Sequence, residues 1–169
     1  MEKHTLYMVT GASCAGKTAA MHELLQHNAA FEIFDIDWLA LPASELAGKS
    51  IYANESTWSA YASLWFEVLH AAYQNGRVPV LFSPASPNDI TRFGQPDWCD
   101  DVKWLLLDCP DDVRVQRMNA RAWDSVRQRE ALASAAQLRT LVKHHIDTSK
   151  HSPSQVAARI TAWLQPKSS

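Results

Sequence analysis

The sequence has few of the residues that stabilise small secreted domains or hold structural metals. Only three of its 169 residues are cysteines, namely Cys14, Cys99 and Cys109. An odd number of widely spaced cysteines, with no C-x-x-C pair, argues against a disulfide framework. No pair of His or Cys residues has the spacing of a zinc site. We therefore expect reduced thiols and no zinc.

Long apolar runs and a strong charge of one sign are also missing. No run approaches the roughly 20 apolar residues that cross a bilayer, and the first residues lack the charged and then apolar pattern of a secretory leader. The net charge is −2 and the pI is about 6.4, which excludes a polycationic nucleic-acid-binding chain. We expect a cytoplasmic protein, monomeric or homodimeric, with no membrane or nucleic-acid partner.

The remaining composition is that of a globular domain. Hydrophobic residues make up 47% of the chain and charged residues 20%, which excludes wholesale disorder. At roughly 150 residues per domain, the length predicts a single domain over residues 1–169. A chain of this length buries a sufficient core without disulfides or metals.

Short apolar runs alternate with segments of helical periodicity along the chain. The runs predict strands at residues 6–10, 31–36, 78–82, 102–107 and 144–146. The periodic segments predict helices at residues 17–27, 39–47, 57–74, 111–119, 130–142 and 153–164. Strands that read as continuous apolar runs indicate an α/β protein with a parallel sheet covered on both faces. Residues 83–101 contain three prolines and are predicted to form a long loop.

Directly after the first predicted strand, the sequence matches the phosphate-binding pattern G-x-x-x-x-G-K-[ST]. The eight residues are Gly11, Ala12, Ser13, Cys14, Ala15, Gly16, Lys17 and Thr18. Glycines let the backbone wrap around an anion, so that successive N–H groups and the following helix dipole face it. Lys17 is expected to contact the β- and γ-phosphates of a nucleotide, and the Thr18 hydroxyl to bind Mg²⁺. The alternative is a glycine-rich turn that binds nothing.

Two carboxylates, Asp35 and Asp37, lie at the end of the second predicted strand. At strand spacing their side chains point the same way, and ligands of open α/β sheets bind beyond the carboxyl ends of the strands. One carboxylate is expected to order Mg²⁺ through water, and the other to accept a proton from a substrate hydroxyl. The alternative is that both cap the next helix, a common role for aspartate.

The phosphate loop, the Asp-x-Asp and the ending Asp147-Thr148-Ser149 before a helix together resemble the small P-loop kinases over nearly the whole chain. These include shikimate kinase, gluconate kinase, chloramphenicol phosphotransferase and "AAA domain" nucleotide-kinase-like proteins. The resemblance implies a three-layer α/β/α fold with five parallel strands in the order 2-3-1-4-5. It also implies that Asp37 meets an acceptor hydroxyl, that Asp35 lies near the metal and that residues 147–149 contact adenine.

The third predicted strand departs from the pattern of these kinases. It ends Val80-Leu81-Phe82-Ser83-Pro84, with no aspartate to serve as a second metal carboxylate and without the Gly-Gly of shikimate kinases. The arginine-bearing segment typical of adenylate-kinase-like proteins is also not evident. Sugars, antibiotics and nucleotides therefore all stay open as acceptors.

A group of arginines follows the fourth predicted strand: Arg114, Arg117, Arg121, Arg127 and Arg129. The resemblance places a lid here, which supplies arginine to the transferring phosphoryl group, and fixed guanidinium groups stabilise the charge of that transition state. We predict a lid at about residues 121–129, with Arg117 and Arg121 as its catalytic arginines. The alternative is a solvated basic face paired with neighbouring acidic residues.

Aromatic residues surround the expected acceptor site, namely Trp38, Tyr52, Trp58 and Trp65. They either stack on an acceptor ring or pack in the core. Arg92, in the predicted long loop, either holds an acidic substrate or is solvated.

The sequence predicts an ATP-dependent, Mg²⁺-requiring phosphotransferase that acts on a hydroxyl of a small metabolite or antibiotic. One alternative is a nucleoside monophosphate kinase, whose phosphate acceptor needs no base. The other alternative is a regulatory protein that binds ATP without catalysis, which the missing aspartate after strand three favours.

Overall fold

The computed structural model describes residues 4–27 and 31–165, and the chain divides into two compact units. The described part of the first unit comprises residues 4–8, 31–83 and 88–103, and that of the second comprises residues 9–27, 84–87 and 104–165. We describe each unit by itself. The single domain and the lid at residues 121–129 stay predictions.

Five strands form one sheet in the order β2-β3-β1-β4-β5. The strands are β1 (His4–Thr10), β2 (Phe31–Asp35), β3 (Val78–Phe82), β4 (Cys99–Asp108) and β5 (His145–Asp147). The pairs β2–β3 and β4–β5 are parallel, with Phe31 opposite Val78 and Leu106 opposite His145. The order and the α/β/α class match the prediction; β3 has the predicted bounds, and the other strands differ from theirs by a few residues.

The first unit contains most of the aromatic core. Its helical elements are η1 (Ile36–Leu39), α2 (Ala40–Ala47), η2 (Glu55–Thr57) and α3 (Trp58–Gln74). Helix α3 packs against β3, and its buried side chains include Tyr61, Trp65 and Leu69. Burying such side chains contributes about 1.5–3 kcal/mol each relative to an exposed position. The helix ends at Gln74, as predicted, and just beyond it the Gly76 N–H donates to the Tyr73 carbonyl.

The predicted long loop at residues 83–101 is wrong in two places. It contains the helix α4 (Pro87–Phe93), and β4 begins at Cys99, three residues earlier than predicted. Helix α4 has no buried residue, so no apolar periodicity reveals it. The early part of β4 contains Asp100 and Asp101, both exposed. Because these first residues of β4 are polar, they do not belong to the apolar run that predicted the strand.

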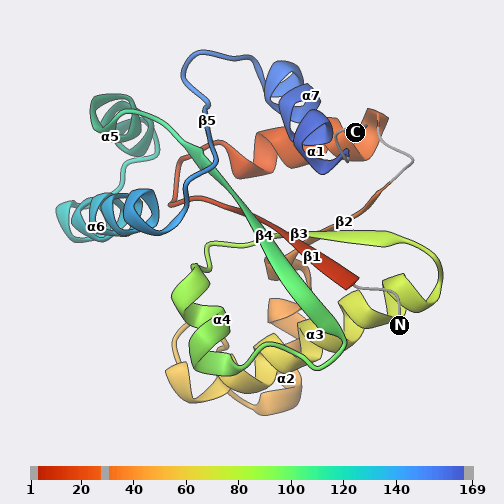
Figure 1. Ribbon diagram of the computed structural model, residues 1–169. Coiled ribbons are helices and arrows are strands. Elements are labelled where there is room, and N and C mark those ends of the chain that lie inside the picture. Colours follow the sequence, from red (N-terminus) through yellow and green to blue (C-terminus); the bar gives the residue numbers. More distant parts are fainter. Residues whose placement is uncertain (1–3, 28–30, 166–169) are drawn as a thin grey trace. The chain divides into compact units, whose positions relative to one another are not determined.

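The second unit contains α1 (Lys17–His27), α5 (Asp111–Ala120), α6 (Ser125–Leu141) and α7 (Pro153–Leu164). Helices α1 and α7 pack side by side (Figure 1). Helix α7 begins as predicted, because the N-cap Ser152 and Gln155 in the first turn form a reciprocal capping box. Helix α6 begins five residues earlier than predicted. Its N-cap is Asp124, whose carboxylate accepts the N–H groups of Val126 and Arg127 at 2.9 Å.

Among residues 4–27 and 31–165, no helix combines the length and the apolar character needed to cross a bilayer.

Candidate functional site

The loop between β1 and α1 forms a tight turn that only small residues permit. The Ala15 N–H donates to the Ala12 carbonyl at 3.2 Å. Gly16 has a φ of +95° and Cys14 a φ of +63°, both in the left-handed region. At Gly11 a Cβ would lie 2.5 Å from the Leu107 carbonyl oxygen at the end of β4. The two motif glycines are therefore required for different reasons, close approach at Gly11 and backbone conformation at Gly16.

Three consecutive carbonyls of this loop are held by side chains from elsewhere in the second unit. The Ser13 carbonyl accepts from Arg114 at 2.6 Å, and the Cys14 carbonyl from Arg117 at 3.0 Å. The Ala15 carbonyl accepts from the Thr148 hydroxyl at 2.7 Å, and that hydroxyl also lies 3.2 Å from Arg117. In a planar trans peptide the C=O of one residue and the N–H of the next point in opposite directions.

The N–H groups of Cys14 and Gly16 consequently point away from Arg114 and Thr148. Helix α1 follows at once, and its first N–H groups have no acceptor within the helix. Successive N–H groups at a helix N-terminus form a site for an anion. The Lys17 ammonium lies over the start of the same loop, where it donates to the Gly11 and Ala12 carbonyls. This arrangement fits the phosphates of a nucleotide.

Mg²⁺ fits the same place through a single protein ligand. The Thr18 side chain is exposed in the first turn of α1, and its hydroxyl offers one oxygen. Among residues 4–27 and 31–165, no group of three or more His, Cys, Asp or Glu side chains could hold a metal. Mg²⁺ with nucleotides takes most of its ligands from phosphates and water, so one hydroxyl suffices.

The predicted lid arginines lie in different surroundings. Arg117 lies in α5 and donates to Cys14 and Thr148, while Arg121 is the exposed C-cap residue of that helix. Four residues separate α5 from α6, and the guanidinium of Arg127 lies 4.2 Å from the centre of the Trp123 ring. The contact of Arg117 and Arg121 with a phosphoryl group stays a prediction.

Sequence reasoning missed an ion-pair network at the carboxyl end of β4. Asp108 accepts from Arg114 at 2.5 Å and from Arg139 at 2.6 Å, and Arg139 also reaches Asp111 at 2.7 Å. The hydrogen bond from Arg139 holds the pKa of the Asp111 carboxyl below its usual value. Asp108 directly follows the apolar run of its strand. That position was a signal, because the carboxyl ends of strands gather functional groups.

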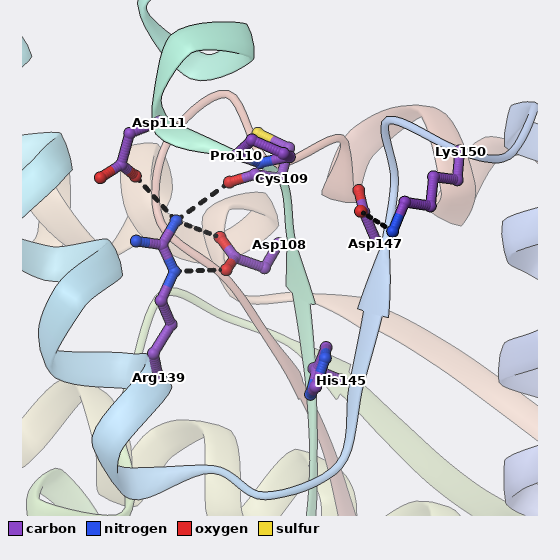
Figure 2. A pocket seen from close by; sticks show the side chains of 8 residues that line it. All are labelled: Asp108, Cys109, Pro110, Asp111, Arg139, His145, Asp147 and Lys150. Atoms are coloured by element: carbon purple, nitrogen blue, oxygen red, sulfur yellow. Dashed lines mark hydrogen bonds and ion pairs between the residues drawn. The ribbon is translucent and has the colours of Figure 1, made fainter.

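Part of this network lines an open pocket of about 320 Å³ (Figure 2). Its wall is formed by Asp108, Cys109, Pro110, Asp111, Arg139, His145, Asp147 and Lys150. Burial raises the pKa of the Cys109 thiol. Lys150 pairs with Asp147 at 3.2 Å, so opposite charges in the pocket wall already compensate each other.

The two carboxylates after β2 belong to the first unit and have unlike roles. Strand β2 ends at Asp35, and Asp37 lies in η1, so the expected strand spacing is wrong. The Asp35 carboxylate accepts the Asp37 N–H at 3.0 Å and caps η1, which is the alternative that the sequence left open. The Asp37 carboxylate accepts a hydrogen bond from the Tyr52 hydroxyl at 2.9 Å.

Aromatic side chains fix the turn that carries Asp37. The Ile36 carbonyl accepts from the Tyr61 hydroxyl and, at 3.1 Å, from the Trp65 indole. Burial, followed by the hydrogen bond and the charge of Asp37, raises the pKa of the Tyr52 phenol. Tyr52 therefore stays protonated and donates to Asp37 at neutral pH.

The four predicted aromatics separate into core and surface. Trp65 is buried, and Trp58 donates its indole N–H to the Ile51 carbonyl at 2.9 Å. Trp38 and Tyr52 are 48% and 62% exposed, which leaves their rings available to a ligand.

Arg92, which the sequence left as a substrate contact or a solvated residue, lies 3.7 Å from Glu55. Strand β3 is followed by the buried Ser83, so no carboxylate stands there.

The fold is that of the small P-loop kinases, as the sequence resemblance implied. A tunicamycin resistance protein from Deinococcus radiodurans has a TM-score of 0.70 at 16% identity, over 98% of each chain. A sugar kinase from Janibacter sp. HTCC2649 has a TM-score of 0.65 at 21% identity, over 96% of this chain and 95% of that one. Shikimate kinase from Acinetobacter baumannii has a TM-score of 0.59 at 15% identity, over 96% and 93%. No protein-family model and no curated protein matches the sequence.

Proposed function

We propose that the protein is an ATP-dependent kinase that phosphorylates a hydroxyl group of a small molecule. The observation that carries the proposal is the loop between β1 and α1. Its Ser13, Cys14 and Ala15 carbonyls are held on one side, so the Cys14 and Gly16 N–H groups face the other. The sugar kinase and the shikimate kinase with the same fold support the choice of a small acceptor.

Each predicted residue has a role in this proposal. Lys17 and the loop N–H groups bind the β- and γ-phosphates, and Thr18 would hold Mg²⁺ directly, while Asp35 would order it through water. Mg²⁺ supplies neutralisation of the phosphate charge. The acceptor oxygen forms a bond to the γ-phosphorus while the bond to the β-phosphate oxygen breaks, and the electron pair leaves with ADP. Asp37 takes the hydroxyl proton, and Arg117 and Arg121 stabilise the transferring group.

A hydroxyl acceptor is favoured over a phosphate acceptor by the charges of the first unit. Asp37 would repel an ionised phosphate at close range. The two arginines among the described residues of this unit, Arg77 and Arg92, lie beside Glu32 and Glu55. A phosphate acceptor needs arginines that are directed at it. The Tyr52 hydroxyl fixes one oxygen of Asp37 and leaves the other for an acceptor proton.

The test is nucleotide binding and turnover in wild type and in Lys17→Ala. Charge-assisted hydrogen bonds contribute about 1.5–3 kcal/mol, so we expect the affinity for a non-hydrolysable ATP analogue to fall by about 10- to 150-fold. Lys143→Ala is the matched control, because Lys143 is an exposed lysine of the same unit. Equal affinity in wild type and Lys17→Ala would contradict the assignment of the loop.

Turnover separates the alternatives. ADP release on sugars, antibiotics or nucleosides supports a hydroxyl kinase. Turnover confined to nucleoside monophosphates would replace it by a nucleotide kinase. ATP binding without turnover across all these acceptors would indicate a regulatory protein.

A further inference from the structure

Arg114 is a fully buried arginine, with 0% of its side chain exposed. It lies in α5, where sequence reasoning expected a solvated or a lid residue. A buried charge is strongly unfavourable unless it is paired and hydrogen-bonded. One end of its guanidinium donates to the Ser13 carbonyl at 2.6 Å and the other to Asp108 at 2.5 Å. Its Nε has no hydrogen-bond partner among the described residues.

These contacts connect the phosphate loop to the end of β4 through one planar group. We call this the Ser13–Arg114–Asp108 bridge. Asp108 is itself fixed from the other side, by Arg139 of α6 at 2.6 Å (Figure 2). The Asp108 backbone carbonyl also accepts the Thr148 N–H at 2.8 Å. Asp108, whose carboxylate orients Arg114, is therefore held through both its side chain and its backbone.

The bridge acts on the loop at its most strained point. Cys14, the residue after Ser13, adopts a φ of +63°, which is unfavourable for a residue with a Cβ. Such a conformation persists only where surrounding contacts determine it. A guanidinium on the Ser13 carbonyl fixes the peptide that joins Ser13 to Cys14. It thereby directs the Cys14 N–H to the side where the loop binds an anion.

We propose that Arg114 is a positioning residue that holds the phosphate loop in its binding conformation before nucleotide arrives. Its role for nucleotide rests on the proposed function, but its role in ordering the loop does not. Arg114 acts through Ser13 and touches no phosphate. A loop that is competent for only a tenth of the time binds its ligand tenfold more weakly, so the bridge contributes to affinity without contacting the ligand.

The experiment compares Arg114→Met with Arg139→Met in the full chain. Both variants remove one arginine from Asp108 and leave the other, but only Arg114→Met removes the contact with Ser13. Backbone order parameters from ¹⁵N relaxation are measured without nucleotide at Ser13, Cys14 and Ala15. We expect about 0.85 in wild type and Arg139→Met, and below about 0.6 in Arg114→Met. The affinity for a non-hydrolysable ATP analogue should fall about tenfold or more in Arg114→Met alone.

Two further variants address folding and charge. If Arg114→Met does not fold, Asp108→Asn/Arg114→Met removes the buried carboxylate charge together with the arginine and is measured instead. Arg114→Lys keeps the charge but lacks the planar fork that reaches two acceptors, so it should not restore loop order or affinity. Recovery of both in Arg114→Lys would overturn the bridge.

The outcomes separate this inference from the proposed function. Unchanged order parameters in Arg114→Met, or equal losses in Arg139→Met, overturn the inference. A disordered loop with affinity within threefold of wild type overturns the positioning role. Wild-type protein that binds no nucleotide, together with a loop that loses order only in Arg114→Met, refutes the kinase and supports the bridge.

Discussion

Gly11→Ala tests the close approach between the phosphate loop and β4. A Cβ at this position would lie 2.5 Å from the Leu107 carbonyl oxygen and 3.2 Å from the Ala15 Cβ. The oxygen belongs to the backbone of a strand that pairs with β5 at Leu107 and Ile146, so it cannot rotate away as a side chain does. Overpacking that forces backbone shifts typically costs about 1–3 kcal/mol, and we expect a loss of about 3 kcal/mol.

The magnitude is checked against a second glycine of the same loop. At Gly16 the nearest atoms to a Cβ are those of Thr148 at 3.5 Å, an ordinary contact, but φ is +95°. Gly16→Ala should therefore lower the free energy of unfolding only by the cost of a left-handed backbone conformation for a residue with a Cβ, about 1–2 kcal/mol. Gly48→Ala, with a φ of +65° and no atom within 4 Å of its Cβ, gives the conformational term outside the loop.

Urea unfolding at 25 °C measures the three free energies, and thermal unfolding gives an independent ranking. For a chain of this size about 3 kcal/mol corresponds to a decrease in Tm of about 6–12 °C. We expect Gly11→Ala to be the least stable variant, and Gly16→Ala and Gly48→Ala to lie close together. Stability of Gly11→Ala within 1 kcal/mol of wild type would refute the reasoning, because the Leu107 carbonyl would then have room to move.

Further predictions concern the acceptor carboxylate and the β4 network. Asp37→Asn should keep the affinity for ATP within a few-fold and lower turnover of the true acceptor by roughly 10²–10⁴, the usual contribution of a positioned base; full turnover would make Asp37 structural. Tyr52→Phe removes only the hydroxyl on Asp37 and should lower turnover less than Asp37→Asn does, as steady-state kinetics would show. The hydrogen bond from Arg139 lowers the pKa of Asp111 from 3.8 in the folded protein. The ionised Asp111 therefore stabilises the folded state above pH 3.8, and this contribution is lost as the pH falls through the lowered pKa. The stability difference between wild type and Arg139→Met should therefore shrink on acidification below about pH 4; a constant difference in urea unfolding would contradict this.

The elements that the sequence predicted share one property, which is that their signal lies in consecutive residues. The buried strand β3 is a continuous apolar run, and the phosphate loop is a contiguous motif. The predicted start of α7 depends on two adjacent residues, Ser152 as N-cap and Pro153 as the first helical residue. Local chemistry of this kind depends on tertiary contacts only weakly.

The missed features lack such a local signal. Helix α4 is short and buries none of its residues, so no periodicity marks it. The start of α6 depends on Asp124, an acidic neighbour of the arginines whose carboxylate caps the helix. The strand spacing expected for Asp35 and Asp37 fails because Asp35 caps a turn that begins directly after it. Aspartate suits a site, a cap and an ion pair equally, and only the backbone around it decides between them.

The arginines of α5 show how far a motif determines its own site. The eight residues of the phosphate loop identify where an anion binds, but not what holds the loop in shape. That is done by Arg114, Arg117 and Thr148, which lie roughly a hundred residues or more from their acceptors. A run of arginines after a strand suggests lid chemistry, whereas a fully buried arginine cannot close over a substrate. Burial therefore distinguishes a positioning arginine from a catalytic one in this chain. That burial depends on how β4, α5 and the phosphate loop pack together, which the sequence alone does not give.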